Sequence, residues 1–417
     1  MTHGSFSLTD ADVRKPSKEK PSNVGAAVGR RHSAPGKIGC DNINFSIILR
    51  IWTRLLNSDA RVDPELALQA VSVASITDAW ICSSNEERLL QGRRRLYLED
   101  KKAITACMNA LVGVVGVDDD GRIDACEWLY QALLRYSNDS IRWSIAQLSS
   151  LMRLAGSSDP GAFDAVRNTL QFAEDENGSL RFSEAVSVYC KTVWKAVKDI
   201  TLVKELTNEE EPLSELLQGS ADDLAKEILD AMELEPDSRI SCSGFMVCCL
   251  GRPKREVLLH QYDLTGGYAK TMSILQLDGI WHTGLVVYDK EYFFNGQLVL
   301  NDPGKTSFGT PTKILHVGYT HRRKKELHAW VVTDLKHVFT RAKYDIVDNN
   351  CNHFTNSMAK WLCDKHLPDE VMGQADRIKR NPMLGQVLKP IFWVADSCHC
   401  NSSSTPSVTG SVCIVSQ

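Results

Sequence analysis

Residues 344–362 read YDIVDNNCNHFTNSMAKWL. After Cys351 the large apolar residues recur three and four positions apart, which is the buried stripe of an amphipathic helix. The residues of this stripe are Phe354, Met358, Trp361 and Leu362. Asn350 directly precedes the stripe and is a favoured N-cap residue. The pattern therefore predicts a helix whose first turn contains Cys351.

A cysteine in the first turn of a helix is well placed to act as a nucleophile. The helix dipole and the backbone N–H groups of that turn stabilise a thiolate, and the same groups can bind an oxyanion. Such a nucleophile needs a histidine held nearby as its general base. The strand-like run WHTGLVVY at 281–288 supplies His282. We expect His282 to take the thiol proton and later to protonate the leaving group.

These segments resemble the PPPDE/DeSI family of permuted papain-like cysteine isopeptidases. The matching residues are Tyr262-Asp263-Leu264, the run GIWHT at 279–283, Glu291-Tyr292-Phe293-Phe294 with Gly296, Gly309-Thr310-Pro311, Tyr344, and Asn350-Cys351-Asn352 with Phe354. The resemblance implies an α+β permuted papain-like (PPPDE) domain at 255–373, in which the histidine precedes the cysteine. It also implies hydrolysis by a Cys351–His282 dyad that needs no cofactor.

The substrates that the resemblance implies are proteins conjugated to ubiquitin or SUMO, or proteins carrying a thioester-bound acyl group. All these reactions pass through an acyl-enzyme and an oxyanion, so the dyad does not separate them. No third member of a triad is assigned, because Asn352 and His353 are expected to point away from the His282 side of Cys351. Gln261 is a candidate oxyanion helper.

Composition and periodicity divide the rest of the chain. Residues 1–39 hold few large apolar groups and are expected to be a disordered tail. Residues 40–233 show apolar residues at helical spacing and few strand signals, which predicts an all-α region. Residues 234–254 contain four Gly and Pro residues and are interpreted as a linker. Residues 374–417 are expected to hold a short helix and a low-complexity tail.

Two segments of the helical region resemble EF-hand calcium loops, namely GVDDDGRIDACE at 116–127 and AEDENGSLRFSE at 173–184. Such loops place oxygen ligands at fixed positions around a glycine at position 6. The candidate ligand residues are Asp118, Asp120, Arg122, Asp124 and Glu127 in the first loop, and Asp175, Asn177, Ser179 and Glu184 in the second. Both loops lack the position-1 carboxylate, since Gly116 and Ala173 stand there, and this should weaken Ca²⁺ binding.

Two alternatives to calcium binding stay open for these loops. The Asp-Gly turns can simply end and start helices. The wide spacing of the loops also resembles that of TerB-like helical domains, which carry acidic turns of this kind.

The bulk properties exclude several classes of protein. The net charge of -4 gives no general attraction to nucleic acid. No run approaches the roughly 18 apolar residues of a membrane-spanning helix, and the N-terminus lacks the apolar core of a secretory signal. The 13 cysteines are odd in number and irregularly spaced, which favours a reducing compartment. We expect a cytoplasmic location that extends to the nucleus.

The N-terminal tail carries one interaction motif. The run RRHSAP at 30–35 resembles a kinase site, and phosphorylated Ser33 would resemble a 14-3-3 ligand because its phosphate could pair with arginine. An unmodified basic tail is the alternative.

The sequence therefore predicts a multidomain protein with an EF-hand-like helical region and a C-terminal cysteine isopeptidase domain. Ca²⁺ bound to the helical region would regulate the enzyme. Two other functions stay open: a protein S-acyl thioesterase that uses the same dyad, and a non-catalytic calcium-responsive adaptor.

Overall fold

The structure, a computed structural model, describes residues 43–56, 63–118, 120–205, 219–232, 234, 237–266, 279–380 and 412–413. The chain forms two compact units, Met1–Pro253 and Lys254–Gln417. The Ser33 motif and the segment 381–411 lie outside the described residues, so the expectations for them stay predictions. Among the helices that are described, none is long and apolar enough to cross a membrane.

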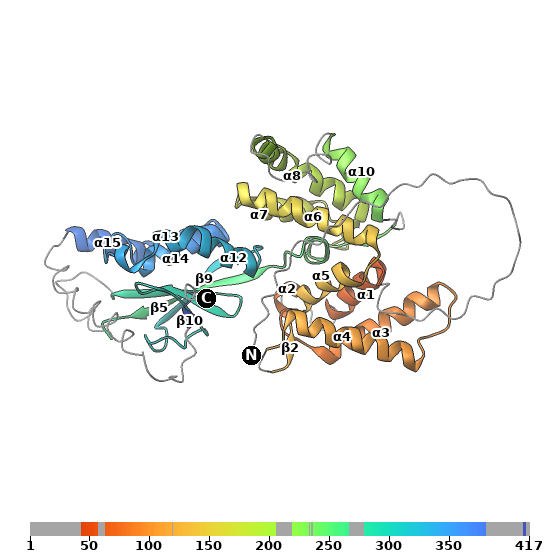
Figure 1. The fold of residues 1–417 in the computed structure, drawn as a ribbon, viewed down its shortest axis with the longest axis horizontal. Helices are drawn as coiled ribbons and strands as arrows, with labels where there is room; N and C mark the ends of the chain where they lie inside the picture. The colour runs from red at the N-terminus through yellow and green to blue at the C-terminus, as the bar shows by residue number, and fades with distance from the viewer. Residues whose placement is uncertain are drawn as a thin grey trace, which may run out of the picture. The chain divides into compact units, whose positions relative to one another are not determined.

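The first unit is helical, which confirms that part of the predicted fold (Figure 1). Its described helices are α1 (Phe45–Leu56), α2 (Pro64–Ala67), α3 (Val73–Leu90), α4 (Leu98–Val115), α5 (Ala125–Tyr136), α6 (Asp139–Ser158), α7 (Ala162–Phe172), α8 (Phe182–Glu205), α10 (Ala221–Met232) and α11 (Cys242–Gly244), followed by a π turn at Phe245–Cys249. Their apolar faces enclose one core that includes Trp128 and Tyr189, both fully buried.

Short strands join the loops of this helical unit in two pairs. Strand β1 (Val71–Ser72) pairs with β2 (Arg122–Ile123), and β3 (Leu180–Arg181) pairs with β4 (Arg239–Ile240), both antiparallel. Each strand lies directly before a helix or its N-cap residue. The two acidic loops, which contain β2 and β3, therefore do not pair with each other. Each pairs with a loop that has no Asp-Gly turn.

The segment 234–254 differs from the linker expected there. Its described part contributes β4, α11 and the π turn, and the side chains of Phe245–Cys249 are buried in the helical core. Arg252 is also buried, with its guanidinium over the ring of Phe163. Gly244 suggested a linker, but it serves close packing. A Cβ at this position would press against Ile240, Ser241 and Trp52.

The second unit contains a six-stranded antiparallel sheet in the order β10-β8-β7-β6-β5-β9. The strands are β5 (Arg255–Asp263), β6 (Trp281–Val287), β7 (Lys290–Phe294), β8 (Leu298–Asn301), β9 (Lys313–Thr320) and β10 (Val412–Cys413). Tyr288 and Asp289 join β6 to β7, and both have positive φ, 53° and 58°. Two such residues make the turn that suits the twist of a hairpin, so β6 and β7 form one.

The helices of this unit gather on one side of the sheet (Figure 1). They are α12 (Lys324–Trp330), α13 (Lys336–Val338), α14 (Cys351–Cys363) and α15 (Asp369–Arg380), with a π turn at Val331–Leu335 between the first two. Phe354 and Met358 of α14 are buried with Leu285 of β6 and Phe294 of β7. Burial of these side chains fixes α14 along the centre of the sheet.

Candidate active site

Cys351 is the first residue of α14 and is 1% exposed. The side chain of Asn350 accepts hydrogen bonds from the backbone N–H groups of Asn352 and His353, at 2.9 and 3.2 Å. The predicted N-cap and the position of the cysteine in the first turn are thus confirmed. Because the cap uses those two N–H groups, they do not serve as oxyanion donors in this arrangement.

The loop before Cys351 is held by its own hydrogen bonds. Asp345 Oδ1 accepts from the backbone N–H groups of Val347 and Asp348, both at 2.8 Å. The backbones of Asp345 and Asn349 also bond to each other in both directions. The hydrogen bonds from Asp348 and Val347 hold the pKa of the Asp345 carboxyl below its ordinary value. This loop sets the direction in which the chain enters α14.

Asn352 joins α14 to the strand that carries His282. Its Oδ1 accepts from Thr283 Oγ1 at 2.8 Å, and its Nδ2 donates to the backbone oxygen of Trp281 at 3.3 Å. Thr355, one turn further along α14, lies 2.7 Å from the same threonine hydroxyl. Asn352 thus bonds to the two chain neighbours of His282, and the expectation that it points away from the imidazole itself stays a prediction. No local pattern indicated that Asn352 would bond to Thr283, which lies 69 positions before it.

His282 is 4% exposed and pairs with Tyr262 in the register of β5 and β6. Side chains alternate along a strand, so His282 leaves β6 on the face opposite to Thr283. Its imidazole is stacked on the ring of Phe308, with centroids 3.7 Å apart and planes 25° apart. The first turn of α14 is thus bound to the residues on either side of His282. This places the two predicted catalytic residues on directly bonded segments.

Gln261 lies on the α14 face of the sheet, opposite Thr283 in the register. Its Nε2 donates to Glu370 of α15 at 3.4 Å, while its Oε1 has no hydrogen-bond partner among the described residues. An oxyanion needs donors. The oxyanion role of Gln261 stays a prediction, and it requires that Nε2 leaves Glu370.

Several other cysteines of the described chain are core residues, whereas Cys82 is exposed and Cys363 is half-buried. Burial raises the pKa of Cys190 and of Cys242 to about 12 in each case, and it raises the pKa of Cys248 and Cys249 as well. Thiols in this state are not nucleophiles near neutral pH.

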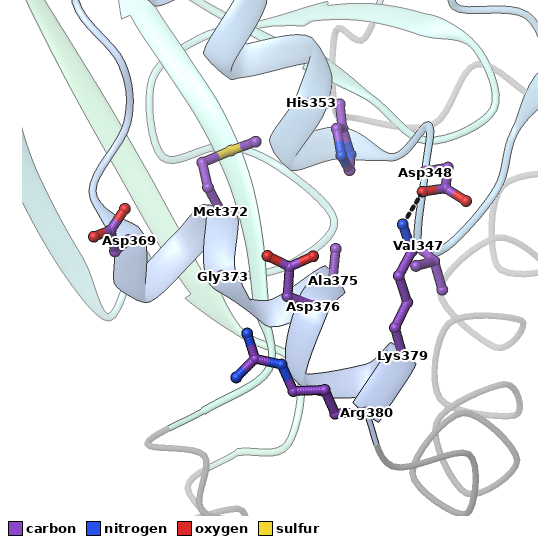
Figure 2. A pocket seen from close by; sticks show the side chains of 10 residues that line it. All are labelled: Val347, Asp348, His353, Asp369, Met372, Gly373, Ala375, Asp376, Lys379 and Arg380. Atoms are coloured by element: carbon purple, nitrogen blue, oxygen red, sulfur yellow. Dashed lines mark hydrogen bonds and ion pairs between the residues drawn. The ribbon is translucent and has the colours of Figure 1, made fainter.

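A cavity of about 560 Å³ lies beside the first turn of α14 (Figure 2). His353 faces it from α14, Asp348 from the preceding loop, and Asp376 from α15. Lys379 closes one side through an ion pair with Asp348 at 2.5 Å. Burial lowers the pKa of His353, so its imidazole favours the neutral form.

The first calcium-loop candidate is held by an arginine. Arg122 Nε lies 3.0 Å from Asp118 and its Nη2 lies 2.8 Å from Asp120. The Asp124 side chain caps α5 by accepting from the N–H groups of Cys126 and Glu127, and the Glu127 carboxylate accepts from Gln131.

The second loop has the same feature, although its arginine comes from the paired loop. Arg239 bonds to Asp175 and to Ser179, and Asn177 donates its backbone N–H to Asp175. Glu184 is exposed in α8. Throughout the described ranges, no three His, Cys, Asp or Glu side chains are arranged to hold a metal ion. Calcium binding stays a prediction.

Comparison with known proteins places the C-terminal unit. The model of the PPPDE peptidase domain matches residues 255–391. Desumoylating isopeptidase 1 of Xenopus laevis and that of Homo sapiens are each 31% identical over 141 residues, which are 33% of this chain and 83% of each relative. A homologue from Caenorhabditis elegans is 28% identical over 155 residues, 34% of this chain and 45% of its own length.

The matched residues 255–391 include strands β5 to β9 and α14, so they cover the segments that hold Cys351 and His282. They define the C-terminal unit as a cysteine hydrolase of the isopeptidase class. The chain belongs to the PPPDE/DeSI peptidase family, as the resemblance in its motifs implied.

Replacing Asn352 by alanine should loosen the joint between α14 and β6. Thr283 and the Trp281 carbonyl would each lose a buried partner, and we expect a loss of about 2 kcal/mol in the free energy of unfolding. Urea denaturation of the full chain measures it. Ser357→Ala is the matched control, since that hydroxyl bonds only to the backbone oxygen of His353 within α14. Equal stability of the two variants would contradict the assigned role.

Asp345 should make stability depend on acid pH. Its pKa in the folded chain is below the ordinary value of 3.8, so its contribution is present above that value and is lost as pH falls through the folded pKa. The wild type should exceed Asp345→Asn in urea midpoint at about pH 6, and the difference should shrink toward about pH 3. A difference that is constant over this range would show that the carboxylate charge is not involved.

Proposed function

We propose that this protein removes SUMO from the lysine side chains of conjugated proteins, with Cys351 as nucleophile and His282 as general base. The observation that carries the proposal is the pair of hydrogen bonds between the first turn of α14 and the strand of His282, in which Asn352 accepts from Thr283 and donates to the Trp281 carbonyl. Two relatives named desumoylating isopeptidase 1 support SUMO as the modifier.

The reaction begins with a proton transfer from the Cys351 thiol to the imidazole of His282. The thiolate attacks the isopeptide carbonyl carbon, and the resulting oxyanion collapses with loss of the lysine amine. His282 donates its proton to that amine as the C–N bond breaks. Water then attacks the thioester while His282 accepts a proton from it. The products are the free modifier carboxylate, the free lysine and the restored thiol.

A permuted papain-like fold is part of the same proposal. Its support is the chain order of the strand with His282 before the helix with Cys351, together with the position of that helix along the central strands of the sheet. In a papain-like enzyme of ordinary order the cysteine helix comes first.

A thiol-reactive SUMO probe should label the wild-type chain at Cys351. Cys351→Ala should abolish labelling, and His282→Ala should slow it by at least about 100-fold because the general base is lost. Cys363→Ala is the matched control, since it removes a thiol from the last turn of the same helix. Full labelling of Cys351→Ala would overturn the proposal.

The substrate is identified by assaying the wild type and the same three variants with fluorogenic SUMO, fluorogenic ubiquitin and a palmitoyl-thioester reporter. Turnover of SUMO alone supports the proposal. Turnover of ubiquitin supports the same chemistry with a different modifier. Turnover restricted to the thioester supports the S-acyl thioesterase alternative.

We further propose that the helical unit is built from EF-hand-like helix–loop–helix pairs in which an arginine neutralises each acidic loop. The two strand pairs between loops support this architecture. Arg122 and Arg239 occupy Asp118 and Asp175, the carboxylates on which Ca²⁺ binding would depend. Calcium regulation of the enzyme would therefore require that the ion displaces both guanidinium groups.

Removal of either arginine should raise the affinity for Ca²⁺. Isothermal titration of the full chain should give little heat at millimolar Ca²⁺ for the wild type and a measurable isotherm for Arg122→Gln or Arg239→Gln. Lys102→Gln is the control, because Lys102 pairs on the exposed surface of α4 with Glu99. Tight binding by the wild type would contradict the neutralised loops and would support calcium regulation.

A further inference from the structure

The side of the sheet away from α14 holds a buried carboxylate for which the proposed reaction has no use. Glu291 of β7 is 0% exposed and accepts from Tyr262 Oη at 2.7 Å and from the backbone N–H of Gly304 at 2.8 Å. Its Oε2 also lies 3.1 Å from His260 Nδ1. A buried carboxylate with three partners is expensive to maintain unless its surroundings are fixed around it.

The neighbouring strand is shaped to admit this carboxylate. A Cβ on Gly284 would overlap Glu291 Oε1, so glycine is required two residues after His282 on the same face of β6. The glycine that ends the WHTG run of β6 is therefore matched to the glutamate that begins the EYFF run of β7.

Glu291 fastens the loop between β8 and β9. Gly304 belongs to this loop and has φ of +70°, a conformation in which its N–H points at the carboxylate. Tyr262 binds both Glu291 and the Thr306 side chain, and burial raises the pKa of Tyr262 well above its ordinary value, so its hydroxyl stays protonated and can donate. Thr306 in turn accepts the backbone N–H of Phe308 at 3.3 Å.

The fastened loop presents one aromatic ring to His282. Phe308 is half-buried, and its ring is stacked on the imidazole. Phe293 meets the imidazole edge-on at 5.4 Å, and Tyr262 lies 6.1 Å from it. The π face of a ring restrains the plane of a stacked imidazole and attracts it more strongly when it is protonated.

We propose that Phe308 is a positioning residue for His282, held in place by the buried Glu291–Tyr262–Thr306 network. The inference rests on the proposed function, because it assigns a role toward His282 as the general base. When the thiol proton of Cys351 moves to His282, the imidazolium forms against the ring of Phe308. The aromatic ring thus favours the thiolate–imidazolium pair and fixes the orientation from which the proton is later returned.

The test compares Phe308→Leu with Phe308→Tyr in the full chain. Leucine keeps an apolar cover and removes the π face, whereas tyrosine keeps the ring. Alkylation of Cys351 by iodoacetamide is followed against pH by mass spectrometry of its peptide, which separates it from exposed Cys82. For Phe308→Leu we expect about a tenfold slower reaction near neutral pH and an acid limb about one pH unit higher. Phe308→Tyr should stay within about twofold of wild type.

Turnover of the fluorogenic SUMO substrate gives a second measurement. Phe308→Leu should lower kcat by about tenfold and leave KM within about twofold, because the ring acts on proton transfer and not on substrate affinity. Thr306→Val, which removes only the hydroxyl that accepts the Phe308 N–H, should lower kcat in the same direction by a smaller factor. Thermal midpoints verify that each variant is folded.

The outcomes separate this inference from the proposed function. If His282→Ala reacts with iodoacetamide as the wild type does, the dyad itself is wrong. If His282→Ala is impaired while Phe308→Leu matches wild type in alkylation and in kcat, the dyad stands and the role of Phe308 is overturned. A change in KM alone for Phe308→Leu would also overturn it, since that result assigns the ring to substrate binding.

Discussion

The amide of Asn352 holds the peptidase unit in its working arrangement. It bonds at once to a side chain and to a backbone carbonyl of β6, on either side of His282. Both bonds are buried, so losing either one would lower the free energy of unfolding. These bonds hold the first turn of α14 against β6. Reaction geometry that must be kept within a fraction of an ångström depends on such a joint.

The two faces of the central strands contact different parts of the unit, because side chains alternate along a strand. Leu285 and Thr283 face α14 and anchor the helix that begins with Cys351. His282 and Gly284 face the other way, where Glu291 and the aromatic rings gather. Strand β6 is buried on both faces. One face contacts the apolar core under α14, and the other contacts the polar network around Glu291.

The helical unit shows a different use of charge. In each acidic loop a guanidinium lies against the carboxylate at position 3, and in the second loop it comes from the partner loop across the β3–β4 pair. These ion pairs are exposed, so each contributes little to stability. Each guanidinium would instead compete with a metal ion, because it lies against the carboxylate oxygens that the ion would need as ligands.

Local patterns were enough to predict the elements that bear the site. Apolar spacing and the Asn350 cap indicated where α14 begins, and the strand-like residues around His282 predicted β6. The helical nature of the first unit also followed from periodicity. Such features depend on neighbours within a few residues, and those are visible along the chain.

The contacts that join these elements are made by residues far apart in the sequence, and local patterns did not predict them. No spacing in the sequence indicated that Asn352 meets Thr283, that Glu291 lies beneath Gly284, or that Phe308 covers His282. The same holds for the pairing of β3 with β4, which placed Arg239 on Asp175 and drew a supposed linker into the helical core. Residue types and their spacing, through the resemblance to a known family, indicated the class of reaction. Tertiary packing decided which side chains surround Cys351 and His282, since such contacts form only where separate segments are buried against each other.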